Sequence, residues 1–151
     1  FVSLAEELEF LEKYMDLHRL RLEERLRFER SVPQDLLDAA VPTFILQPLV
    51  ENAIEHGVAL RSEGGTISVE ARLRGGMLEL SVRNPMPPPR ARRRPRSGVG
   101  LAITRERVAR GYPGEGTFEF AAEGHEAVAR VGIPHRTISR KEAVWPTGSG
   151  L

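Results

Sequence analysis

One stretch decides the fold of this chain, and it reads Leu46-Gln47-Pro48-Leu49-Val50-Glu51-Asn52-Ala53-Ile54-Glu55-His56-Gly57. Its apolar residues recur at steps of three and four, which predicts an amphipathic helix. Gly57 stands where a helix C-cap is expected, and Pro42 lies near the expected first turn. Pro48 predicts a kink or a loosened turn inside the helix.

Four polar residues interrupt the apolar side of this helix. Residues three or four apart on a helix are neighbours, so Glu51 stacks with Glu55, and Asn52 with His56. The strip therefore offers carboxylates, an amide and an imidazole beside an apolar body. One interpretation is a solvated helix face, and the other is the wall of an active site.

A second motif, Gly98-Val99-Gly100-Leu101, opens another predicted helix. Glycines at a helix start let backbone N–H groups approach an anion, and the helix dipole favours negative charge there. The preceding residues, 84–97, are rich in proline and arginine and predict a mobile basic flap beside a phosphate site. Three other interpretations of this loop remain open: a merely solvated loop, a proline-rich peptide ligand, and a nucleic-acid-binding arm.

The two motifs together predict a nucleotide site with a metal ion. Magnesium prefers oxygen ligands and is commonly held by few protein groups plus substrate phosphates, so the Asn52 amide suffices. Glu51 could polarise an attacking group or order metal-bound water, and His56 could donate to a phosphate. The chain contains neither a P-loop nor a Rossmann glycine motif, which disfavours the common phosphate-binding folds.

Composition excludes several classes of protein. The chain has 151 residues, 40% hydrophobic content and a net charge of +1, as in an ordinary globular domain. It contains no cysteine, so disulfides and thiolate metal sites are impossible. No apolar run approaches the roughly 20 residues that a membrane helix needs. Because the chain begins at Phe1 in mid-pattern, we expect a piece of a longer protein. The expected location is cytoplasmic, as the cytoplasmic part of a membrane-anchored sensor in one interpretation.

Hydrophobic periodicity predicts one domain with helices and hairpins in alternation. The expected elements are a helix over 4–25, a strand over 27–32, the helix over 46–57, a hairpin of 66–73 and 77–82, a helix over 101–110, and a hairpin of 117–121 and 127–133. Leu73 is expected on the inner face of the first hairpin, and Ile103 on the inner side of the last helix. This order predicts a two-layer α/β sandwich, with a mixed, mostly antiparallel sheet and the helices on one face.

The 46–57 and 98–101 motifs, followed by Arg105-Glu106-Arg107-Val108, closely resemble LytS-type sensor histidine kinases. In that family the first motif is the N box and the second the glycine-rich G2 box. The resemblance covers about residues 3–134 and implies the Bergerat (GHKL, HATPase_c) ATP-binding fold, shared with gyrase and MutL. It divides the chain into a helix over 1–26 that links to an absent phosphoacceptor region, a catalytic domain over 27–134, and a polar tail over 135–151.

The resemblance also assigns roles to single residues. Asn52 would ligate Mg²⁺ and Glu51 would assist phosphoryl transfer, while His56 would lie near the ATP phosphates. The remaining nucleotide contacts would come from Asn84, at the place that reads the adenine, and from Gly98, Gly100 and Leu101 of the G2 box. Residues 85–97 would form the ATP lid.

The sequence departs from the family pattern at three places. Asn84-Pro85-Met86-Pro87-Pro88 replaces the usual Asp-x-Gly-x-Gly box, so a neutral amide stands where the family has a carboxylate. Ile103 stands where an asparagine usually follows the G2 box, and the phosphoacceptor-histidine motif is absent. His18 does not match that motif, and its position beside an apolar stripe predicts packing.

The leading hypothesis is the catalytic, ATP-binding domain of a two-component sensor histidine kinase, which transfers the γ-phosphate to a histidine on another domain. The expected partners are that phosphoacceptor domain, a response regulator and a second copy through the first helix, with no nucleic acid. Three alternatives remain: a degenerate nucleotide sensor, a serine kinase of the anti-sigma-factor type, and a ligand-free dimerisation module.

Overall fold

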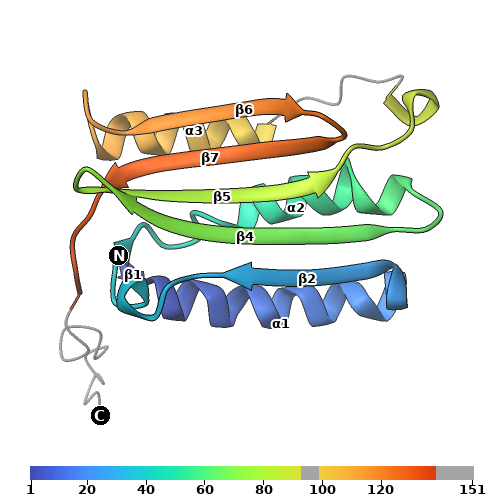
Figure 1. Ribbon diagram of the computed structural model, residues 1–151, viewed down its shortest axis with the longest axis horizontal. Coiled ribbons are helices and arrows are strands. Elements are labelled where there is room, and N and C mark those ends of the chain that lie inside the picture. Colours follow the sequence, from blue (N-terminus) through green and yellow to red (C-terminus); the bar gives the residue numbers. More distant parts are fainter. Residues whose placement is uncertain (93–98, 139–151) are drawn as a thin grey trace, which may run out of the picture.

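The computed structural model describes residues 1–92 and 99–138 (Figure 1). In chain order the elements are β1 Val2–Ser3, α1 Leu4–Leu22, β2 Leu26–Ser31, β3 Ala40–Val41, α2 Gln47–Glu55, β4 Gly65–Arg74, β5 Met77–Pro85, α3 Val99–Gly111, β6 Thr117–Glu123 and β7 Glu126–Pro134. Short 3-10 turns lie at Glu23–Arg25, Gln34–Leu36, Val58–Leu60 and Pro89–Arg92. None of the helices in the described ranges is both long and apolar enough to cross a lipid bilayer.

Five strands form the main sheet in the order β2-β4-β5-β7-β6. β2 pairs with β4 in parallel, and every other neighbouring pair is antiparallel. A separate two-stranded ribbon joins β1 to β3. The prediction of a mixed, mostly antiparallel sheet is confirmed.

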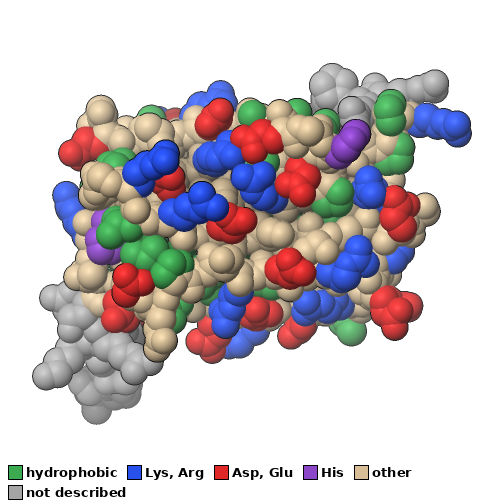
Figure 2. Space-filling view, viewed as in Figure 1, with side chains coloured by type: hydrophobic (Ala, Val, Ile, Leu, Met, Phe, Trp, Pro, Cys, Tyr) green, Lys and Arg blue, Asp and Glu red, His purple; other side chains and the backbone are tan. Residues whose placement is uncertain are grey.

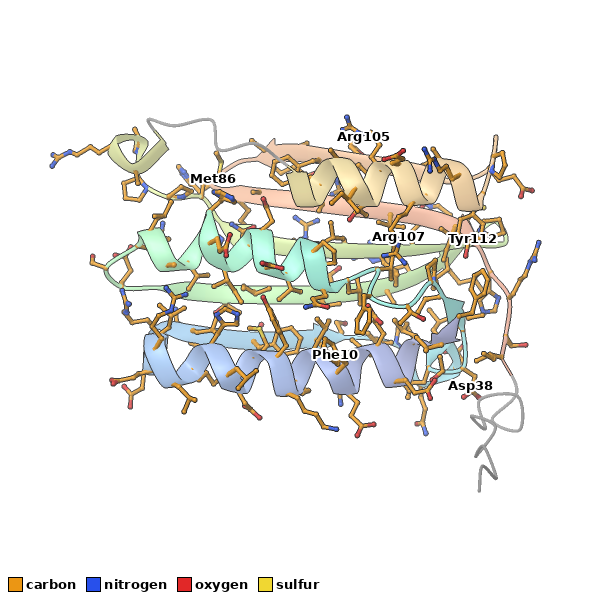
Figure 3. The ribbon with its side chains drawn as sticks, turned by 180° about the vertical axis from the view of Figure 1, so that it is seen from behind. Phe10, Asp38, Met86, Arg105, Arg107 and Tyr112 are labelled. Carbon is orange, nitrogen blue, oxygen red and sulfur yellow. The ribbon has the colours of Figure 1, made fainter. Side chains whose placement is uncertain are left out.

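The three helices cover one face of this sheet, as the view from behind in Figure 3 shows. The inward side chains of β4 and β5 are buried against them, and one apolar core joins all three helices to the sheet. The opposite face carries intermixed basic and acidic side chains (Figure 2). The predicted two-layer sandwich is therefore confirmed, and α1 packs on the same core as the rest of the domain.

The first hairpin is the element that the sequence predicted best. Gly75 and Gly76 have φ angles of +56° and +78°, in the left-handed region that glycine adopts without steric cost. The inner face matches the prediction except at Leu73, which is 49% exposed although its cross-strand partner Leu78 is buried.

Helix α1 begins with a capping box, which the sequence Ser3-Leu4-Ala5-Glu6 predicts. The Ser3 N–H donates to the Glu6 carboxylate over 2.8 Å, and the Glu6 N–H donates to the Ser3 hydroxyl over 3.2 Å. The apolar stripe then buries four residues completely: Leu4, Leu8, Leu11 and Met15. The helix predicted over 4–25 is confirmed, with its last three residues tightened into a 3-10 turn.

Helix α2 begins at Gln47, so two predictions about prolines were wrong. Pro42 lies before the helix, outside its first turn. Pro48 is the second helical residue and does not interrupt the helix. An N–H in the first turn has no partner within the helix, so its absence at Pro48 removes no hydrogen bond.

Two further predictions needed correction. In α3, Ile103 points outward and is 48% exposed, whereas Thr104 is buried and donates its hydroxyl to the Gly100 carbonyl over 3.1 Å. Asn84 and Pro85, expected in the mobile loop, are the last residues of β5. The rest of the expected flap at 93–97, Gly98 and the tail from residue 139 lie outside the described residues.

Candidate functional site

One face of α2 connects the motifs that the sequence singled out. Pro48, Asn52 and His56 follow each other at four-residue steps and therefore share one side of the helix. At a rise of 1.5 Å per residue this line extends about 12 Å. Its two ends meet segments that are far away in the sequence.

At the Pro48 end lies the start of α3. A Cβ added to Gly100 would be 3.7 Å from the Pro48 carbonyl oxygen, which is an ordinary van der Waals contact. Packing between the two helices therefore does not require glycine at this position. Glycine itself places no side chain beside the first turn of α3, where the N–H groups have no partner within the helix. Leu101, which follows, is half-buried and packs against the core.

At the other end Gly57 touches Asn84, the buried residue near the end of β5. A Cβ on Gly57 would lie 2.2 Å from Asn84 Nδ2 and 2.6 Å from the Ala53 carbonyl oxygen. The prediction that Gly57 is the C-cap was wrong by one position, because His56 is the C-cap and Gly57 follows it with a φ of −127°. Any side chain at position 57 would clash with the Asn84 amide, so this position requires glycine.

The Asn84 side chain is 5% exposed, and its Nδ2 donates to the Pro85 carbonyl oxygen over 3.0 Å. No hydrogen bond between described residues uses its Oδ1. The hydrogen bond from Nδ2 thus orients the amide, and Oδ1 can accept a hydrogen bond from a ligand.

Asn52 occupies the middle of this face. Its side chain is half-exposed and forms no hydrogen bond with another described residue, so its amide oxygen is available. His56 is also half-exposed, and its backbone N–H donates to the Asn52 carbonyl over 2.9 Å. Within residues 1–92 and 99–138 no three His, Asp or Glu side chains converge on a point that could hold a metal ion.

Glu51 and Glu55 lie on the neighbouring side of α2, toward α1. Both carboxylates act on Tyr14 and His18 of α1, whose rings meet edge to face with centroids 4.6 Å apart. Burial, reinforced by these two carboxylates, raises the pKa of Tyr14 to about 12. The predicted single polar strip is therefore divided, with Asn52 and His56 on one side and the two glutamates on the other.

The charges of Glu51 and Glu55 affect the pKa of His18. Burial and the charge of Arg21 lower the pKa of His18 below its usual 6.5, while Glu51 and Glu55 oppose them. Removing both carboxylates, in a Glu51→Gln/Glu55→Gln variant, should lower the His18 pKa further. Histidine ring signals followed by NMR against pH would measure it, with Glu9→Gln as the control.

An unchanged His18 pKa in the double variant would mean that the glutamates do not face α1. Because the folded chain binds this proton less tightly than the unfolded chain, His18 costs stability as the pH falls below 6.5. That cost should be larger in the double variant.

The segment after β5 is anchored on both sides. Arg61 donates through Nη1 to the Met86 carbonyl oxygen over 2.9 Å and through Nε to that of Gly64, also over 2.9 Å. The Met86 N–H donates to the His125 carbonyl oxygen over 2.8 Å (Met86 is labelled in Figure 3). The expected lid therefore leaves the sheet from a fixed point beside Asn84.

Sequence reasoning missed Glu7, which is 2% exposed and caps α2 from another helix. Its carboxylate accepts the Leu46 N–H over 2.9 Å, whereas α2 has no side-chain cap of its own. A carboxylate at a helix N-terminus contributes roughly 0.5–2 kcal/mol. The available signal was its position: Glu7 lies between Leu4 and Leu11 on the apolar stripe, where a charge needs a partner.

The sequence relatives of this chain are sensor kinases. It is 38% identical over 82 residues to the sensor histidine kinase BtsS of Escherichia coli (strain K12), which covers 54% of this chain and 15% of BtsS. It is 37% identical over 68 residues to the sensor protein LytS of Oceanobacillus iheyensis, which covers 45% of this chain and 12% of LytS. The matches thus span less than a fifth of these relatives. No protein-family profile matches the chain.

Solved structures agree on the fold. The catalytic domain of histidine kinase ThkA superposes with a TM-score of 0.68 at 20% identity, covering 90% of this chain and 96% of that domain. ThkA in complex with the response regulator TrrA superposes with a TM-score of 0.60 at 23% identity, covering 85% of this chain and 40% of that chain. The fold is that of histidine kinase catalytic domains.

Proposed function

We propose that this chain, a homologue of sensor histidine kinases with the fold of their catalytic domains, binds Mg-ATP and transfers its γ-phosphate to a histidine on another domain. The observation that carries the proposal is the position of α2 between two distant motifs. Gly100 lies beside Pro48 in its first turn, Asn84 lies against Gly57 just after its end, and the half-exposed Asn52 lies between them. These residues come from three separate motifs, and packing alone does not explain the available amide of Asn52 or the bare glycine at 100.

Each end of α2 suits one part of the nucleotide. Unpaired N–H groups in the first turn of α3 suit the phosphates, and the Asn84 Oδ1 suits the adenine amino group. The half-exposed Asn52 between them would hold the metal through its Oδ1. Bound Mg²⁺ would neutralise the charge that develops on the phosphate oxygens during transfer.

The other predicted residues have supporting roles in this proposal. His56, one turn beyond Asn52, would donate to a phosphate oxygen. Glu51, the exposed residue before Asn52, would orient the attacking imidazole. Gly98 would complete the phosphate contacts, and Leu101 would close the core side of the pocket.

The Gly100→Ala variant should change the affinity for nucleotide without reducing the stability of the fold. The added methyl meets only ordinary contacts, and alanine is the better helix former, so the variant should unfold at the same temperature or higher. Its Mg-ATP affinity should fall by about tenfold, because the methyl crowds the phosphates. Thermal unfolding followed by circular dichroism and calorimetric titration would measure the two effects, and unchanged affinity would remove Gly100 from the site.

Phosphotransfer itself requires an acceptor. We expect label from γ-labelled ATP to appear on a phosphoacceptor domain of a LytS-type kinase, supplied as a separate chain. Phosphohistidine is acid-labile and base-stable, whereas phosphoserine survives acid. An acid-stable product would favour the serine-kinase alternative, and a product that then passes to a response regulator would support two-component signalling.

One observation favours the degenerate-sensor alternative: Asn84 is neutral and its donor is committed to Pro85. Nucleotide binding without label transfer to any acceptor would support that alternative. The kinase proposal further implies a cytoplasmic location, where ATP is available, and a homodimer through α1. The oligomeric state of the chain can be checked by light scattering.

A further inference from the structure

Three helices meet at the short segment that leads into α2. This segment, residues 43–46, carries strain, because Phe44 has a φ of +59°, a region that bulky side chains rarely adopt. A conformation of this kind persists only where surrounding contacts fix it. The contacts here come from two charged side chains, one on α1 and one on α3.

From α1, the buried Glu7 carboxylate accepts the Phe44 N–H over 3.0 Å through Oε2 and the Leu46 N–H over 2.9 Å through Oε1. Burial raises the pKa of Glu7, and the hydrogen bonds of this segment and the charge of Arg107 counter that shift. The Phe10 ring packs edge-on against Phe44, with centroids 4.9 Å apart, and supports the same segment.

From α3, Arg107 holds the carbonyl oxygens of the same segment. Its Nη2 donates to the Thr43 oxygen over 2.6 Å and its Nη1 to the Phe44 oxygen over 3.1 Å. Figure 3 shows Arg107 between α3 and the chain entering α2, with Phe10 on the α1 side. One carboxylate thus accepts hydrogen bonds from two N–H groups of the strained segment, and one guanidinium donates hydrogen bonds to two of its carbonyl oxygens.

We propose that Glu7 and Arg107 are positioning residues for the nucleotide site: they fix the start of α2, and with it Asn52, relative to α1 and α3. This inference rests on the function proposed above. Neither side chain contacts the face of α2 that would hold the nucleotide, so both act through the helix. Since α2 has no side-chain cap of its own, releasing this segment would let Asn52 shift relative to the first turn of α3.

The test separates positioning from a general loss of fold. Glu7→Gln keeps the shape of the side chain but accepts with one oxygen only, and Arg107→Lys keeps the charge but loses the two-pronged donor. Both variants are titrated with Mg-ATP and with ATP in the presence of a metal chelator, by NMR chemical shifts. Each titration is made at a temperature where circular dichroism shows the variant fully folded.

Because Asn52 would act through the metal, both variants should lose Mg-ATP affinity by about tenfold, while their affinity for metal-free ATP should stay within about twofold. The exposed pairs Glu9–Lys13 and Arg110–Glu106 supply matched controls, Glu9→Gln and Arg110→Lys, which should bind both forms like the unmodified chain.

Equal losses of affinity for Mg-ATP and for metal-free ATP would mean that fewer chains are in a state that binds nucleotide at all, and would overturn the inference. No loss in either variant would overturn it as well. If the unmodified chain itself bound neither form, the proposed function would fail and this inference with it.

Discussion

Replacing Asn52 by alanine is expected to reduce the affinity for Mg-ATP by about 10- to 100-fold, the range for losing one charge-assisted contact. The chain should remain folded, because Asn52 is half-exposed and its side chain bonds to no other described residue. Calorimetric titration measures the affinity, and thermal unfolding measures the stability. Glu55→Gln, three residues further along the same helix, is the matched control and should bind like the unmodified chain.

The metal dependence makes this prediction specific. If the amide acts through Mg²⁺, then Asn52→Ala and the unmodified chain should bind metal-free ATP with similar affinity. Binding of Mg-ATP that is insensitive to Asn52→Ala would remove the metal role of this residue, and with it the middle of the proposed site.

Gly57→Ala is expected to have the largest effect on stability. Its methyl group would meet the Asn84 amide and the Ala53 carbonyl oxygen, and neither can move freely. Overpacking of this kind costs about 1–3 kcal/mol of unfolding free energy. Since the displaced Asn84 would carry the adenine contact, nucleotide affinity should fall in parallel. Urea unfolding and calorimetric titration would measure the two effects.

Gly111→Ala is the control for this substitution. Gly111 is the last residue of α3, and an added Cβ there meets nothing within 4 Å. The control should be neutral or slightly stabilising, because alanine favours helix. A Gly57→Ala chain as stable as this control would show that Gly57 and Asn84 do not pack as described.

The sequence was informative where local chemistry decides the structure. The Gly75-Gly76 turn and the Ser3–Glu6 capping box each have one favoured conformation, so the structure matched the predictions. The apolar faces of α1 and α2 were also correct, because the helical period determines them. Together with the hairpins, these elements suffice for a two-layer sandwich.

The sequence was less informative where distant segments meet. Gly57 looked like a helix cap, but its role depends on Asn84, which is 27 positions further along the chain. Glu7 looked like one more surface glutamate, and its partners, Phe44 and Leu46, lie beyond two strands. A periodic pattern also cannot show which flank of α2 faces α1, and this is why Glu51 and Asn52 were placed on one strip.

The candidate site was predicted only in part, because its residues come from segments that are distant in the sequence. The motif residues were recognisable one by one, and the structure places Gly100 and Asn84 near opposite ends of α2, with Asn52 between them. The metal and nucleotide roles of Asn52, Glu51, His56, Asn84, Gly98, Gly100 and Leu101 remain predictions.

Calorimetric titration of the unmodified chain with Mg-ATP shows whether the nucleotide binds along α2. We expect a saturable signal for one site per chain, which excess ADP reduces and Asn52→Ala weakens. A chain that is folded by circular dichroism yet releases no binding heat at millimolar Mg-ATP would contradict the proposed function.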